Sequence, residues 1–353
     1  MQLILNFTSQ RNQQVVIGNT LSDSIETIQG VPQGTVLGPI LFNIYMNDIT
    51  NCITNNCKII LYADDCLIYS ADPRPDIALK NLQICIANIE KYFQANKLTL
   101  NASKTDFICF SGTRTTDDNC QLNVENSNIK LKSEVRYLGV IIDNKLNFQS
   151  QVKNVLKKMA IGIKTIQTIR NNLPKKCLKV LLQSLVLSHF DYCNIMLTNI
   201  SSKLLLSLEK QLNWALKTVF YRSKNKSSTS LRICENILSM KQGIELKSLD
   251  LLFSILKNER KAFQDHLALP TVNFRMNDRN KKIILLEPSS GAFLSGSFFH
   301  TSARSWNSLP IDLRSINHKR DKWKCRIKQH MLHLYKECPT FYQNSTWRDF
   351  QLL

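Results

Sequence analysis

The spacing of hydrophobic residues predicts a first part of the chain that mixes strands with helices. Two short runs rich in β-branched and aromatic side chains, residues 59–62 and 67–69, flank a pair of aspartates and predict a β-hairpin. Apolar positions at helical spacing predict helices over residues 40–49 and 76–97. Weak alternation within residues 1–30 predicts one or two strands. Further strands are expected near residues 98–100, 107–110 and 135–142. We therefore expect an α+β first part, with helices packed on one face of a mostly antiparallel sheet.

From about residue 147 the pattern changes to one amphipathic helix after another. Pro174 and the Ser/Lys-rich stretch 223–230 interrupt it, and residues 270–318 are less regular because they hold several prolines and glycines. The predicted helices span residues 151–170, 175–197, 202–221, 244–266 and 319–336. These changes of pattern predict three regions, residues 1–146, 147–268 and 269–353.

Composition indicates a globular protein with a polyanionic partner. Of the 353 residues 43% are hydrophobic, and there is no run of about 18 apolar residues that would cross a membrane. The 11 cysteines lie mostly in apolar settings, which is typical of reduced core residues in an intracellular protein. Residues 1–150 carry 12 basic and 14 acidic side chains, whereas residues 151–353 carry 34 and 13. This basic excess predicts nucleic-acid binding by the second half, with a merely solvated surface as the alternative.

Asp64 and Asp65 are the most informative candidate site. Neighbouring residues of a straight strand point to opposite faces, so a tight turn is needed to bring both carboxylates to one ligand. Carboxylates at a rigid turn suit a hard divalent ion such as Mg²⁺, which takes carboxylate and phosphate oxygens together. The alternative is ordinary turn chemistry, in which aspartate simply favours the bend.

Five blocks of sequence occur in an order and spacing that point to one family. The Tyr-Ala-Asp-Asp block at 62–65 is weak evidence alone, and four further blocks strengthen it. They are GVPQGTVLGPILF at 30–42, FQANKLTLNASKT at 93–105, VRYLGVIID at 135–143 and RSWNSLP at 304–310. Together they resemble the reverse transcriptases of non-LTR (LINE-like) retrotransposons, and the resemblance covers nearly all of residues 5–330.

The resemblance implies a partial palm of a right-hand polymerase with a remnant of the fingers at residues 1–146. It implies an α-helical thumb or connection at 147–268 and a basic C-terminal region with a terminal helix at 269–353. The implied activity is that of an RNA-directed DNA polymerase, a nucleotidyltransferase that uses two Mg²⁺ ions. The implied partners are an RNA template, a DNA primer and deoxynucleoside triphosphates, and the implied location is the nucleus.

The resemblance also assigns roles to single residues. Asp64 would be the main metal ligand, with Asp65 supporting it. Gln33 and Gly34 would lie against the template and the nucleotide pocket, since glycine lets the backbone approach a nucleotide; a helix-initiating turn is the alternative. Lys104 would neutralise or protonate the departing pyrophosphate, or else face solvent. Leu138 and Gly139 would belong to a hairpin that supports the primer end; a buried strand with a glycine bulge is the alternative. The lysines that would contact the phosphate backbone of the duplex are Lys153, Lys157, Lys158 and Lys164.

One requirement of the family pattern is not met. The catalytic chemistry expects a third carboxylate on a strand well before the glycine-rich loop, and Asp23 and Asp48 lie in the wrong elements to replace it. The expectation is therefore an N-terminally truncated reverse transcriptase whose polymerisation is severely impaired or lost. A non-catalytic nucleic-acid-binding remnant of a retroelement is the second hypothesis, and an unrelated basic helical protein is the third.

Overall fold

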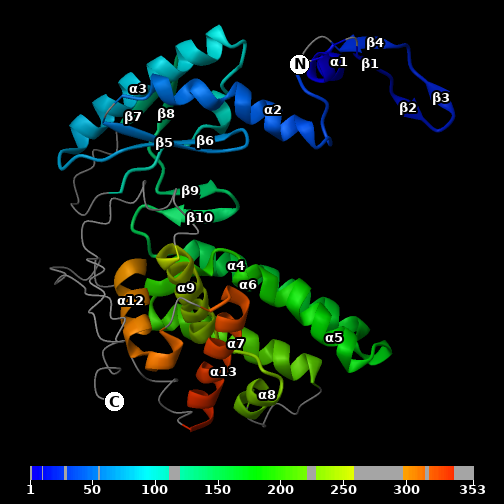
Figure 1. Ribbon diagram of the computed structural model, residues 1–353, viewed down its shortest axis with the longest axis vertical. Coiled ribbons are helices and arrows are strands. Elements are labelled where there is room, and N and C mark those ends of the chain that lie inside the picture. The colour runs from blue at the N-terminus through cyan, green and yellow to red at the C-terminus, as the bar shows by residue number, and fades with distance from the viewer. Residues whose placement is uncertain are drawn as a thin grey trace. The chain divides into compact units, whose positions relative to one another are not determined.

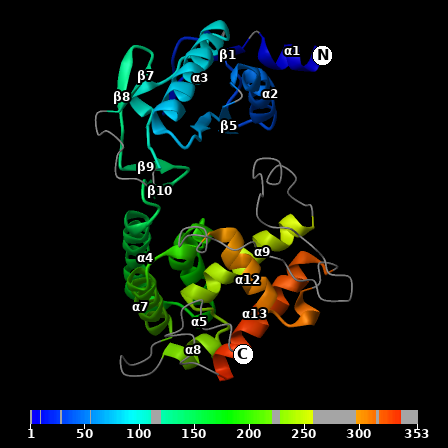
Figure 2. The ribbon, with the colours of Figure 1, turned by 90° about the vertical axis from the view of Figure 1, so that its left-hand side faces the viewer.

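The computed structural model (Figures 1 and 2) forms two compact units. They are the N-terminal unit, Met1–Val135, and the helical unit, Arg136–Leu353. The structure describes residues 2–9, 11–27, 30–54, 56–110, 120–220, 228–257, 297–314 and 318–337. Within these ranges no helix has the length and apolar character needed to span a membrane. The division of the second half into a thumb at 147–268 and a separate region at 269–353 stays a prediction.

The N-terminal unit begins with a helix and four short strands. The strands pair antiparallel, β1 with β4 and β2 with β3, so that the second pair continues the first as one long hairpin. Val16 and Ile17, at 64% and 76% exposure, show that its apolar side chains are left uncovered in the described structure. The elements are α1 (Gln2–Thr8), β1 (Arg11–Gln13), β2 (Val16–Ile17), β3 (Thr20–Leu21) and β4 (Ile25–Thr27), which is more than the one or two strands predicted.

A hydrophobic core holds the predicted aspartate hairpin against a long helix. Strands β5 (Cys57–Tyr62) and β6 (Asp65–Ser70) pair antiparallel, and α3 (Pro75–Ala95) packs on them (Figure 1). Helix α2 (Leu37–Tyr45) and a 3₁₀ turn, Asn47–Cys52, join the same core. Because side chains alternate along a strand, every second residue of β5 faces inward. The buried members are Met46, Ile49, Cys57, Cys85, Ile89, Tyr92 and Phe93. The predicted hairpin and the helix predicted at 76–97 are confirmed, whereas the helix predicted at 40–49 ends at Tyr45 and is followed by the 3₁₀ turn.

The strand predicted near residues 98–100 is not formed. Lys97 takes a φ of 53°, and the Leu98 amide bonds to the Phe93 carbonyl at 2.8 Å, which ends α3 with a left-handed cap. Leu98 and Leu100 then pack against the core around the hairpin without pairing in a sheet. The alternating apolar residues correctly indicated that Leu98 and Leu100 are packed against the core, but the strand predicted from them is wrong.

The strands form small separate sheets. The strand expected at 107–110 is reduced to a single bridge between Phe107 and Leu131. The hairpin of β7 (Gln121–Val124) and β8 (Ser127–Lys130) packs on α3. Among the described residues there are five two-stranded sheets, so the larger sheet expected for this part is absent from them. The unit is α+β, as predicted.

The helical unit begins with a hairpin and continues as helices. Strands β9 (Glu134–Tyr137) and β10 (Val140–Asp143) form this hairpin where the residue pattern predicted a strand over 135–142 and the family resemblance implied a hairpin. The boundary between the units falls within β9. The helices are α4 (Gln149–Ile169), α5 (Lys175–Leu182), α6 (Ser188–Asp191), α7 (Ser202–Val219), α8 (Ser228–Cys234), α9 (Met240–Leu256), α12 (Phe298–Ser308) and α13 (Arg320–Glu337). The helix predicted at 175–197 is divided by a π-turn, Gln183–Leu187. The end of the helix predicted at 244–266 lies outside the described residues.

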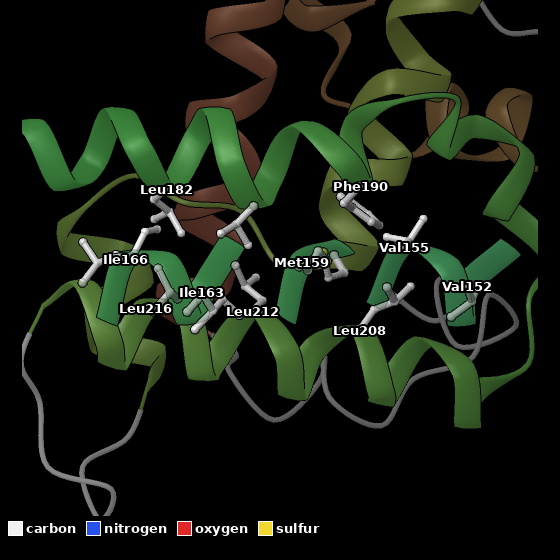
Figure 3. Packing of buried hydrophobic residues seen from close by; sticks show 14 of the residues in the cluster. Val152, Val155, Met159, Ile163, Ile166, Leu182, Phe190, Leu208, Leu212 and Leu216 are labelled. Carbon is white, nitrogen blue, oxygen red and sulfur yellow. The ribbon is translucent and has the colours of Figure 1, made fainter. Parts of the chain in front are cut away.

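Helices α4 and α7 bury their apolar faces against each other. Figure 3 shows Met159 and Ile163 of α4 facing Leu208 and Leu212 of α7. The four side chains are each 1% exposed or less, so the contact between the two helices is fully buried. The helical period places such residues on one stripe, as the sequence pattern predicted.

Gly162 lies where α4 crosses the π-turn. A Cβ atom at this position would lie 2.2 Å from the carbonyl oxygen of Leu185, so the backbones approach more closely than any side chain allows. Glycine is therefore required at position 162 by tertiary packing, although it lies in the middle of a helix.

A second core joins α9, α12 and α13. The ring of Trp323 stacks on Phe253 at 4.3 Å between centroids and lies 5.9 Å from Trp306. Trp306, from the predicted block at 304–310, is only 1% exposed. This tryptophan is a packing residue, and the block builds the core of the C-terminal helices.

Glu209 of α7 connects three helices. One carboxylate oxygen accepts a bond from Arg232 of α8 at 2.8 Å, and the other accepts the Met240 amide at 2.7 Å, at the start of α9. The Arg232 side chain is 6% exposed and that of Glu209 is 18% exposed, so the ion pair is largely desolvated. The negative charge also lies at a helix N-terminus, where it is stabilised by the helix dipole.

Candidate active site

The tip of the β5–β6 hairpin carries two exposed carboxylates. Ala63 and Asp64 form the turn, and Asp65 opens β6 opposite Tyr62. Ala63 takes a φ of 53°, a left-handed conformation typical of tight hairpin turns. Within the described residues neither carboxylate makes a hydrogen bond or an ion pair. The predicted turn is confirmed, and both carboxylates are available to an external ligand.

The thiols below this turn add no charge at neutral pH. Burial, followed by the neighbouring Cys85, raises the pKa of Cys66 to about 11. Burial, followed by the neighbouring Cys57, raises the pKa of Cys85 to about 11. Both thiols stay protonated near neutral pH, so neither adds a negative charge beside the turn.

The glycine-rich loop leads directly into α2. Gly34 takes a φ of 74°, and both Gln33 and Gly34 are exposed. The Thr35 hydroxyl donates to the Pro32 carbonyl at 2.7 Å and accepts the Gly38 amide at 3.2 Å. The helix-initiating turn is therefore present, and it leaves the two predicted binding residues facing outward.

Tyr92 fixes the end of α2 to α3. Its hydroxyl donates to the Asp48 carboxylate at 2.5 Å and lies 3.1 Å from the Tyr45 carbonyl. Burial, and then the bond to Asp48, raises the pKa of Tyr92 above its usual value. The helix that follows the loop and the aspartate hairpin thus pack on the same helix, α3, through one apolar core and these hydrogen bonds.

Lys104 ends a short 3₁₀ turn after α3. The Asn101 side chain accepts its amide at 3.2 Å, which fixes the turn. The Lys104 side chain is exposed, and the nearby Asp106 is already paired with Lys132. Its ammonium group makes no ion pair within the described residues, so its role near a triphosphate stays a prediction.

Leu138 and Gly139 form the turn of the β9–β10 hairpin. Their φ angles are 44° and 81°, so both central residues are left-handed, as in a type I′ hairpin turn. The alternative of a buried strand with a glycine bulge is therefore wrong. Support of a primer end by this turn stays a prediction.

Two polar residues missed in the sequence hold this hairpin on the helical unit. Gln151 of α4 accepts the Ile141 amide of β10 at 3.0 Å. Asp143 accepts the amides of Asn147 at 3.0 Å and Phe148 at 2.6 Å, which shapes the loop into α4. Aspartate after a strand is a weak turn signal, whereas a glutamine on an amphipathic helix gives none.

Three of the four lysines predicted to bind the duplex lie on one exposed side of α4. Lys153, Lys157 and Lys164 are exposed and make no ion pair with the described residues, whereas Lys158 is half-buried. Separations of four and eleven residues place the three exposed lysines on one stripe of the helix. Ile161 is 59% exposed on the same stripe. We call Lys153, Lys157, Ile161 and Lys164 the α4 stripe.

Each unit holds one pair of the predicted residues at a tight turn. Asp64 lies beside Asp65 in the N-terminal unit, and Leu138 lies beside Gly139 in the helical unit. No described hydrogen bond or ion pair joins Gln33, Gly34 or Lys104 to the aspartates. In the part of the chain that the structure covers, no three His, Cys, Asp or Glu side chains are placed to hold a metal ion. Carboxylate oxygens are donors of the kind that Mg²⁺ takes, and the ion needs more ligands than two carboxylates supply.

Comparison with known proteins agrees with the geometry of the hairpin. The family model described as "Reverse transcriptase (RNA-dependent DNA polymerase)" matches residues 2–142. Residues 2–142 resemble a reverse transcriptase. This reverse transcriptase-like segment contains the glycine-rich loop, the aspartate hairpin and the β9–β10 turn, and the resemblance stated from the sequence blocks is confirmed for these residues.

Similar proteins come from non-LTR retrotransposons of insects. A probable RNA-directed DNA polymerase from transposon X-element of Drosophila melanogaster is 25% identical over 44% of this chain. The RNA-directed DNA polymerases from mobile element jockey are 24% identical over 43% of this chain in Drosophila melanogaster and 29% identical over 44% in Drosophila funebris. Each match covers 17% of the relative, so this chain spans a small part of the proteins it resembles.

Proposed function

We propose that the chain supplies the primer- and nucleotide-binding part of an RNA-directed DNA polymerase of the non-LTR retrotransposon type. The observation that carries this proposal is the exposed Asp64–Asp65 pair at a tight turn of the reverse transcriptase-like segment. Asp64 is the main metal ligand, and Asp65 supports it from the first position of β6. Bound Mg²⁺ supplies charge stabilisation to the attacking and leaving oxygens of nucleotidyl transfer.

The remaining predicted residues complete this proposal. Gln33 and Gly34 face the template and the nucleotide pocket, and the exposed ammonium group of Lys104 meets the triphosphate. Leu138 and Gly139 support the primer terminus. The substrates are an RNA template, a DNA primer and deoxynucleoside triphosphates, and the proposed place of action is the nucleus.

The α4 stripe is the proposed duplex-binding surface. Its lysines have no acidic partner among the described residues, so their charges are available to phosphates. Lysine contacts of this kind hold a nucleic acid without reading its sequence. The exposed Ile161 between the lysines is suited to packing against sugars.

The first prediction concerns the salt dependence of duplex binding. Binding of an RNA–DNA primer–template is measured by fluorescence anisotropy at several salt concentrations. In the double variant Lys153→Gln/Lys157→Gln, the negative slope of log Kobs (the observed association constant) against log salt concentration is expected to become shallower by about 2. Each lysine that contacts a phosphate accounts for about 0.9 of that slope in B-DNA. The matched control is Lys203→Gln/Lys210→Gln on the exposed face of α7, which is expected to change the slope much less. Equal effects of the two variants would show that charge alone, and not the α4 stripe, determines binding.

The second prediction concerns catalysis by this chain. We expect no primer extension on an RNA template with Mg²⁺, because the described residues offer only the two hairpin carboxylates as a partial ligand set. A gel assay with labelled primer measures this directly. Extension by the chain that Asp64→Asn abolishes would contradict the prediction. Extension that survives Asp64→Asn comes from a contaminating polymerase.

The second candidate function is nucleic-acid binding without catalysis. The partial ligand set together with the unpaired lysines of α4 favours it. The two functions differ at the hairpin, because a nucleotide-binding site needs its metal ligands. If Mg²⁺ strengthens triphosphate binding and Asp64→Asn/Asp65→Asn removes that effect, the polymerase proposal is supported. If Mg²⁺ has no such effect and duplex binding is intact, the binding remnant is the better description.

A further inference from the structure

The β9–β10 hairpin is fastened to the helical unit along its length. Asp143 shapes the loop at its base, and Gln151 holds strand β10 at Ile141. At the other end, the hydroxyl of Tyr192 donates to the carbonyl oxygen of Leu138 at 2.6 Å, at the very tip of the turn. The same ring lies 3.8 Å from the position a Cβ would take on Gly139.

The conformation of the turn formed by Leu138 and Gly139 requires stabilisation from outside the hairpin, more than the two strands do. Leu138 is a non-glycine residue at a φ of 44°, a conformation that L-residues disfavour. Two-stranded hairpins are also only marginally stable by themselves in water. A hydrogen bond to the Leu138 carbonyl fixes the peptide plane between the two turn residues, and therefore the direction in which the turn points.

Tyr192 is connected to the helical core by the residues just before it in sequence. It follows α6, and its neighbour Phe190 is 4% exposed and points into the α4–α7 core (Figure 3). Asp191 accepts a bond from Gln183 of the π-turn at 3.0 Å. The tyrosine thus extends from a packed part of the helical core to the tip of a thin hairpin, although 54 residues separate the bonded partners.

We propose that Tyr192 is a positioning residue for the primer terminus, which acts by fixing the turn formed by Leu138 and Gly139. This inference rests on the proposed function, in which that turn supports the primer end. Tyr192 touches no substrate. Its hydroxyl fixes the turn, and the fixed turn holds the terminal base pair of the primer.

The experiment compares Tyr192→Phe with the matched control Tyr45→Phe in the full chain. Both tyrosines are about half exposed, and both hydroxyls donate to a backbone carbonyl, that of Tyr45 to Asn96. The phenylalanine at 192 keeps the ring against Gly139 and removes only the hydrogen bond. Amide hydrogen exchange over residues 134–143 is expected to accelerate roughly three- to tenfold in Tyr192→Phe and to stay unchanged in Tyr45→Phe. Equal exchange in Tyr192→Phe and the unaltered chain would overturn the proposal.

A second readout tests the primer end itself. A primer–template with 2-aminopurine as the 3′-terminal primer base reports the stacking of that base by its fluorescence. In Tyr192→Phe we expect duplex affinity within about twofold of the unaltered chain, because the α4 lysines remain, and a loss of half or more of the fluorescence change. An unchanged fluorescence response would overturn the positioning role. If the unaltered chain binds no duplex at all, the proposed function fails, and hydrogen exchange alone decides whether Tyr192 fixes the turn.

Discussion

Replacing Glu209 with alanine is expected to lower the free energy of unfolding of the helical unit by about 3–5 kcal/mol. The substitution leaves the guanidinium of Arg232, 6% exposed, without its carboxylate partner at 2.8 Å. It also removes the acceptor of the Met240 amide, so the N-terminus of α9 loses a capping partner. Chemical denaturation followed by circular dichroism measures the change, since most of the helical signal belongs to this unit.

Two further variants identify the cause. The pair Glu209→Leu/Arg232→Met is expected to recover most of the lost stability, because replacing both charges by apolar side chains leaves no buried charge alone. Asp312→Asn is the control, since Asp312 meets Arg326 at the same distance of 2.8 Å but with 65% and 42% of the side chains exposed. That exposed pair is expected to contribute less than about 1 kcal/mol. A Glu209→Ala variant no less stable than Asp312→Asn would contradict the explanation.

Gly162→Ala is expected to destabilise the helical unit by about 3 kcal/mol or more. The added methyl would lie 2.2 Å from the Leu185 carbonyl oxygen, and backbone atoms cannot turn away as a side chain can. Alanine favours a helix over glycine by about 1 kcal/mol, so the clash must exceed that gain. The helix and the π-turn would have to move apart and open the core that includes Ile163.

Gly243→Ala is the matched control for that clash. It also replaces a helical glycine, but the nearest atom to the new Cβ is a ring carbon of Phe190 at 3.2 Å, which can shift by a few tenths of an ångström. We expect a change within about 1 kcal/mol, of either sign, from helix propensity and this small adjustment. Thermal and chemical unfolding of both variants gives the comparison, and equal losses would show that the π-turn contact is not the cause.

Those parts of the candidate site whose conformation depends on residues adjacent in sequence could be predicted. Asp64 and Asp65 lie between two runs that pair with each other, so the turn follows from the residues beside it. The loop before α2 is local in the same sense, because the Thr35 hydroxyl accepts the Gly38 amide in the first turn of the helix that follows it. What these residues bind could not be read from spacing alone, and it was the order of the blocks that indicated a polymerase.

The polar residues that fix the β9–β10 turn and connect the helices were missed because their partners are distant in sequence. Tyr192 bonds to a carbonyl 54 residues earlier, and Glu209 bonds to an amide 31 residues later. A tyrosine or a glutamate on an amphipathic helix has the same pattern whether its partner is another helix or water. The π-turn at 183–187 and the need for Gly162 are likewise results of packing between helices, which hydrophobic periodicity does not report.

The uncovered apolar side chains of the N-terminal unit have a practical consequence for handling the protein. Val16 and Ile17 lie on short strands whose edges are unpaired in the described structure, and Ile44 of α2 is 66% exposed. Open strand edges beside apolar side chains are templates for aggregation. Purification of this chain therefore calls for low protein concentration and a solubilising fusion partner, and light scattering should accompany every binding measurement made with it.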